Sequence, residues 1–110
     1  MRMAPDESIW LGTLRVVLGF PYANSKKDKR KVISKLRDRF RSRYNLTVAE
    51  VGHLESYRKG VFVAAMIGND AKSIQSFLDI RANELPMLID ARIDWISVTI
   101  HKPQFQDFQP

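Results

Sequence analysis

The chain has 110 residues, a single-domain length, and a net charge of +6 from 18 Lys and Arg residues against 12 Asp and Glu. It contains no cysteine, which excludes disulfides, thiolate metal sites and cysteine nucleophiles. Its longest apolar run, residues 61–67, is far shorter than the roughly 20 residues of a membrane-spanning helix, and no signal-peptide core follows residues 1–8, so we expect a cytoplasmic protein.

The first predicted element is a β-strand over residues 10–20. It follows a short polar lead-in, residues 1–8. Large apolar and β-branched side chains alternate along it, with the period of two that is typical of a strand. Residues 21–24 (P-Y-A-N) then predict a turn.

A helix is predicted to begin at Ser25, whose hydroxyl can cap the first turn, with Asp28 three residues on as in a capping box. We expect it to end near Tyr44, because Asn45 readily adopts the left-handed conformation that stops helices. Apolar residues at helical spacing define its buried stripe: Val32, Ile33, Leu36, Phe40 and Tyr44.

The second half of the chain predicts three more strands and a second helix, and the sequence contains no internal repeat. Residues 46–51 and 61–67 predict two strands joined by a polar loop. Asn69 or Asp70 can cap a second helix, and Pro86 is expected to lie at its end. Residues 89–100 predict the last strand, with a bulge near Trp95–Ile96, where the alternation is imperfect.

The element order βαββαβ predicts an α+β ferredoxin-like sandwich, with two helices on one face of a four-stranded antiparallel sheet. We expect one domain over residues 9–101 and a flexible tail over residues 102–110. The third strand is apolar on both sides, which is typical of a strand covered on both faces. The open face is therefore expected to be covered by a second copy, making a homodimer, or by the tail with Phe105 and Phe108. The predicted dimer interface consists of Phe62, Ala64 and Met66.

The positive charge of the chain is concentrated in the first helix. Ten of the 18 Lys and Arg residues lie between Lys26 and Arg43 with only two acids, a net charge of +8, while the remaining residues carry a net charge of −2. Such density favours a polyanionic partner, RNA or DNA first. Arg can contact phosphate oxygens through two N–H groups and Lys acts as a point charge. The predicted phosphate contacts are Lys27, Arg30, Lys31, Arg37 and Arg41.

The alternative for this helix is a solvated charged surface without a ligand. Against it stand six like-charged pairs four residues apart, each of which destabilises an isolated helix by about 0.2–0.5 kcal/mol. We predict that Arg37→Glu combined with Arg41→Glu abolishes RNA binding without unfolding the domain.

Three segments of the sequence resemble the YlxP-like family of small bacterial proteins. They are L-R-V-V-L at residues 14–18, S-K-K-D-K-R-K-V-I-S-K-L-R-D-R-F-R-S-R-Y-N-L-T-V-A-E-V-G at residues 25–52, and N-D-A at residues 69–71. One departure is Lys27, where the family usually has leucine. The resemblance implies a ferredoxin-like fold and no established activity. The family's genes often lie beside translation and ribosome-maturation genes, which implies RNA or the ribosome as the partner.

Base stacking on the sheet, as in the RNA-recognition motif, requires aromatic rings in the first and third strands. The first strand has no suitable ring. We therefore expect Phe62 in the core or a dimer interface, and Trp10 and Trp95 in or near the core.

Catalytic chemistry has little support in the sequence. His53 with Glu50 and Glu55 could form an acid–base cluster, but an ordinary surface loop is the favoured interpretation, and no set of zinc ligands has suitable spacing. We expect a non-catalytic protein without cofactor or metal that contacts RNA or the ribosome. The alternative is a homodimeric or small-ligand regulatory module that docks an acidic protein partner.

Overall fold

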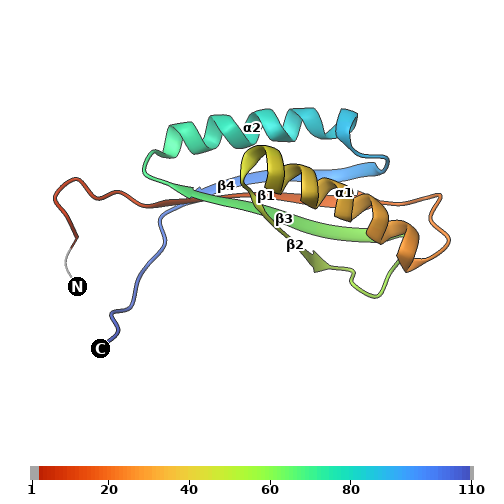
Figure 1. Ribbon diagram of the computed structural model, residues 1–110, viewed down its shortest axis with the longest axis horizontal. Helices are drawn as coiled ribbons and strands as arrows, with labels where there is room; N and C mark the ends of the chain where they lie inside the picture. The colour runs from red at the N-terminus through yellow and green to blue at the C-terminus, as the bar shows by residue number, and fades with distance from the viewer. Residues whose placement is uncertain (1–2, 110) are drawn as a thin grey trace.

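The computed structural model describes residues 3–109 and contains one four-stranded antiparallel sheet with two helices on one face (Figure 1). The order is βαββαβ and the strands lie side by side as β2-β3-β1-β4, which confirms the α+β ferredoxin-like fold. The elements are β1 Trp10–Gly19, α1 Lys26–Tyr44, β2 Thr47–Gly52, β3 Lys59–Gly68, α2 Ala71–Leu88 and β4 Arg92–His101.

Both ends of α1 form as the sequence predicts. The Ser25 hydroxyl accepts a hydrogen bond from the backbone N–H of Asp28 at 3.2 Å, which satisfies one of the free donors of the first turn. Asn45 adopts a φ of 53° and its N–H donates to the Arg41 carbonyl, so the chain leaves the helix in the left-handed conformation.

The end of α2 lies close to where the sequence predicts it. The helix continues two residues past Pro86, to Leu88, so the proline lies in its last turn. A proline removes only one helical hydrogen bond here, and the N–H of Ile89 still donates to the Leu85 carbonyl at 3.2 Å. The final turn therefore closes around the proline.

The core lies between the sheet and the two helices. Leu14, Val16 and Leu18 of β1 are completely buried and face α1 and α2. Gly12 stands on the same side of β1, where an added methyl group would lie 2.3 Å from Cγ2 of Ile74. The absence of a side chain at this position allows α2 to pack directly on the strand.

The dimer prediction placed Phe62, Ala64 and Met66 on the side of β3 away from the helices, but in the structure this side of the strand faces the helices. Phe62 pairs with Val16 and Ala64 with Leu14, and both are completely buried in the chain's own core. Met66 packs against the same core. These residues are therefore unavailable to a second copy, and the predicted interface was wrong. The side chains of β3 that face away from the helices belong to Val61, Val63, Ala65 and Ile67.

The tail does not cover the exposed face of the sheet. Residues 102–109 contain no helix or strand and run away from the domain at the end where the N-terminal segment also projects (Figure 1). Phe105 is 70% exposed and Phe108 95% exposed, so the prediction that they cover the sheet was wrong. Residues 1, 2 and 110, the outer ends of the predicted lead-in and tail, lie outside the described residues.

A bulge in β4 decides where Trp95 points. Val17 pairs with Trp95 and Leu18 with Ile93, which leaves Asp94 as the extra residue, close to the predicted site. The bulge places Trp95 on the face without helices, where it is 62% exposed. The expectation of a core position was therefore wrong for Trp95, whereas Trp10 is half-buried and packs against the core.

Candidate nucleic-acid interface

Four cations of α1 share one side of the helix, and we call them the cationic stripe: Lys27, Arg30, Arg37 and Arg41. Successive members are three, seven and four residues apart, each close to a whole number of 3.6-residue turns. At a rise of 1.5 Å per residue the stripe is about 21 Å long. Lys27, Arg30 and Arg41 are exposed and Arg37 is half-buried.

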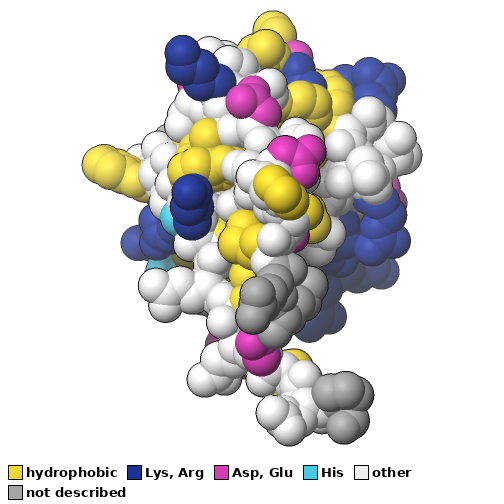
Figure 2. Space-filling model, turned by 90° about the vertical axis from the view of Figure 1, so that its left-hand side faces the viewer, with side chains coloured by type: hydrophobic (Ala, Val, Ile, Leu, Met, Phe, Trp, Pro, Cys, Tyr) yellow, Lys and Arg dark blue, Asp and Glu magenta, His cyan; other side chains and the backbone are white. Residues whose placement is uncertain are grey.

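The four side chains of the stripe form no ion pair within the described part of the chain, residues 3–109, although the lowered pKa of Glu55, caused mainly by Lys26, also reflects the charge of Arg30. In Figure 2 the largest group of Lys and Arg side chains lies along the right-hand side of the view, with others on the left, while Asp and Glu side chains lie mainly toward the middle. The charge of the stripe is therefore available to a ligand.

Lys31, the fifth predicted contact, lies apart from the stripe. It is exposed and lines a pocket of about 500 Å³ between the β1–α1 turn and the α2–β4 connection. The rim carries charges of both signs, from Asp28, Lys31, Asp90 and Arg92. This pocket is a location that the small-ligand alternative can use. Its floor is formed by apolar residues that include Phe20, Ala23, Val32 and Ile89.

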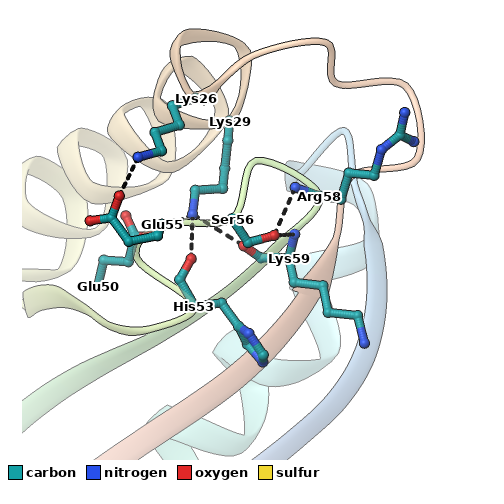
Figure 3. Close-up of polar contacts among 8 residues, drawn as sticks. All are labelled: Lys26, Lys29, Glu50, His53, Glu55, Ser56, Arg58 and Lys59. Carbon is teal, nitrogen blue, oxygen red and sulfur yellow. Dashed lines mark hydrogen bonds and ion pairs between the residues drawn. The ribbon is translucent and has the colours of Figure 1, made fainter.

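Lys29 does not face outward, although it belongs to the same basic run. Its side chain is 2% exposed, and its Nζ atom lies 2.9 Å from Oε1 of Glu50 (Figure 3). The same ammonium donates hydrogen bonds to the carbonyls of His53 at 3.0 Å and Lys59 at 3.1 Å. Two hydrogen bonds and one ion pair surround the three N–H groups of the ammonium. Lys29 therefore anchors the β2–β3 loop beneath α1.

Lys26 holds the same loop from outside, through an exposed ion pair with Glu55. This hydrogen bond from Lys26 is the main cause of a lowered pKa of the Glu55 carboxyl. Two of the ten cations between Lys26 and Arg43 are thus used within the protein, and the charge offered to a partner is smaller than the sequence count.

The sequence contained a signal for Lys29 that the prediction overlooked. Lys29 stands four residues before Ile33, on the same helical stripe as Leu36 and Phe40, all of which are buried. Its partner Glu50 pairs with Phe62 across the sheet, so it faces the helices. A lysine at a core position of the helix and a glutamate on the inner side of β2 indicate a buried ion pair.

The acid–base cluster considered for His53, Glu50 and Glu55 does not form. The two carboxylates are paired with Lys29 and Lys26, and the His53 ring points away from both (Figure 3). His53 instead contributes its backbone, with a φ of 53° and a carbonyl that accepts from Lys29. Within residues 3–109, no group of three or more His, Cys, Asp and Glu side chains could hold a metal ion.

Comparison with known protein families gives a match over most of the chain. The model of a family described as "Protein of unknown function (DUF503)" matches residues 11–94, from the second residue of β1 into β4, including all of α1. No curated protein matches the chain. In the part of the chain that the structure describes, neither helix is long and apolar enough to cross a membrane.

Proposed function

We propose that this chain, which belongs to the family of proteins of unknown function DUF503, is a non-catalytic cytoplasmic protein that binds structured RNA through the cationic stripe of α1. The observation that carries the proposal is the set of four cations on one side of a helix that form no ion pair among residues 3–109. A polyanion with regularly spaced charges fits such a surface.

The positive charges of α1 destabilise the helix itself, which supports the proposal that they are present to bind a ligand. Lys27 lies in the first turn, where the helix dipole disfavours positive charge. Arg37 and Arg41 form a like-charged pair four residues apart, which destabilises an isolated helix by about 0.2–0.5 kcal/mol. A bound phosphate backbone would relieve both effects.

We favour RNA over an acidic protein because the sequence resembles the YlxP-like proteins. The segments S-K-K-D-K-R at residues 25–30 and V-A-E-V at residues 48–51 resemble the YlxP-like proteins, whose genes often lie beside translation genes. That resemblance remains a prediction, and it favours RNA or the ribosome. An acidic protein partner would satisfy the same charges and is the alternative that the experiments must separate.

The contact that α1 offers is to phosphates and not to base edges. Arg30, Arg37 and Arg41 can each place two N–H groups on phosphate oxygens, and Lys27 adds a point charge. Phosphate contacts position a protein on nucleic acid without reading its sequence. We therefore expect binding that depends strongly on salt and little on sequence.

The direct test is titration of a fluorescently labelled RNA hairpin at several salt concentrations, followed by anisotropy. Four phosphate contacts predict that a plot of the logarithm of the binding constant against the logarithm of the salt concentration has a slope of about −2.8 to −3.6, since each contact releases about 0.7–0.9 counterions. Absence of binding at 50 mM salt, or a slope near zero, would exclude the proposed interface.

A further inference from the structure

The face of the sheet opposite the helices carries an exposed aromatic ring beside an exposed arginine. We call this surface, formed by the strand residues that point away from α1 and α2, the open face. Trp95 pairs with Val17, and Arg15 pairs with Ser97, so Trp95 and Arg15 are diagonal neighbours on adjacent strands. Diagonal positions lie about 7–8 Å apart, within reach of long side chains for one shared ligand.

The charge around this pair is positive. Trp95 pairs with Val17 of β1. Arg15 lies two residues before Val17, and Lys59 pairs with Gly19, two residues after it, so the two cations flank Trp95 along the strand direction. The guanidinium of Arg92 covers Gly19, where an added methyl group would lie 2.3 Å from it, and Asp94 neutralises Arg92. Among the paired open-face positions of the described strands, none is Asp or Glu. The remaining half-buried positions near Trp95 are apolar or hydroxylated: Thr13, Val17, Val63 and Ser97.

A second copy of the chain is a poor match to this surface. A two-fold interface places the same patch against itself. Arg15 and Lys59 would approach their own copies. The carboxylate near them is Asp94, which lies close enough to Lys59 for the two charges to interact but forms its ion pair with Arg92, and none of the paired open-face positions of the described strands is Asp or Glu. Burying charges without partners is unfavourable. The occupant must supply both a flat apolar surface for Trp95 and negative charge for the flanking cations.

We propose that the open face binds an unpaired nucleotide segment of RNA, with one base stacked on the Trp95 ring and the neighbouring phosphates contacted by Arg15 and Lys59. A nucleotide combines a planar ring with an anionic group, and stacking on aromatic side chains is the common mode of single-strand recognition. The sequence-based argument against stacking considered rings in the first and third strands, whereas this ring lies in the fourth. That the polymer is RNA rests on the proposed function, but the site itself is on the other side of the sheet from α1.

The test is titration with a six-nucleotide adenine RNA, followed by tryptophan fluorescence. Stacking on Trp95 is expected to quench the emission of the wild-type protein. Trp95→Leu, which keeps an apolar side chain without a stacking ring, is expected to remove the quenching and weaken binding by roughly 5- to 150-fold, the range for one stacked base. Trp95→Tyr should retain most of the affinity. Ile67→Ala is the matched control, because Ile67 is an exposed apolar residue on the same face, 72% exposed.

Two results would overturn the proposal. One is equal affinity of Trp95→Leu and the wild-type protein for the hexanucleotide, measured by anisotropy. The other is a wild-type dimer in sedimentation velocity that Trp95→Leu converts to a monomer, which would assign the open face to a second copy. Failure of the α1 proposal gives a different pattern: the hairpin would not bind, while quenching by the hexanucleotide and its loss in Trp95→Leu would persist.

Discussion

Replacing Lys29 with methionine is expected to lower the free energy of unfolding by about 3–5 kcal/mol, the range for breaking a buried ion pair from one side. Methionine fills a similar volume but leaves Glu50, 17% exposed, without its counter-charge. It also leaves the carbonyls of His53 and Lys59 without the donor that lies 3.0 and 3.1 Å away. Urea denaturation followed by circular dichroism measures the loss.

Lys26→Met is the matched control for this experiment. It removes another lysine from the same end of α1, but its ion pair with Glu55 is exposed, and such pairs contribute at most about 1 kcal/mol. Adding Glu50→Gln to the Lys29→Met variant should recover part of the stability, because the unpaired charge is then absent. Equal losses in Lys26→Met and Lys29→Met would contradict a special role for the buried lysine.

Reversing two charges of the cationic stripe, Arg30→Glu with Arg41→Glu, is expected to abolish measurable hairpin RNA binding at 150 mM salt. Both side chains are exposed and lack ion pairs among the described residues, so the fold should not depend on them. Arg37, which the sequence-based double variant replaces together with Arg41, is half-buried. Replacing Arg30 in its place is therefore less disruptive to the fold. At low salt, where binding remains measurable, the salt slope should shrink by about 1.4–1.8, the equivalent of two phosphate contacts.

The same helix offers a control with an identical change in charge. Lys35→Glu with Arg43→Glu also replaces two cations with two anions, but the helical repeat places these residues more than about 100° around α1 from the centre of the stripe. This variant should retain most of the affinity for the hairpin. If both double variants lose binding equally, net charge alone explains the interaction and the stripe is not a specific surface. Circular dichroism checks that each variant is folded.

The fold could be predicted from the sequence because its signals are local. Ser25 and Asn45 bound α1 through side-chain and backbone preferences that operate within a few residues. The side of β3 that faces the helices could not be predicted in this way. Both of its sides are apolar, so alternation does not distinguish them, and only the pairing of Phe62 with Val16 places it in the core.

The part of the candidate site that depends on local helical periodicity could also be predicted from the sequence. Helical periodicity places Lys27, Arg30 and Arg41 outward, as the structure has them. The internal use of Lys29 depends on Glu50 in a different element, which becomes a neighbour only after β2 pairs with β3. The exposure of Trp95 depends on a single extra residue, since a shift of one position turns every following side chain of a strand to the other face.

The most direct measurement of the central claim is recovery of the tagged protein from the cytoplasm of the cells that produce it, with and without ribonuclease, beside the Arg30→Glu and Arg41→Glu double variant. We predict that the wild-type protein recovers RNA or ribosomal particles, that ribonuclease or high salt removes them, and that the double variant recovers neither. Recovery of one acidic protein by the wild-type chain, unchanged by ribonuclease and lost in the double variant, would contradict the claim and make α1 a protein-docking surface.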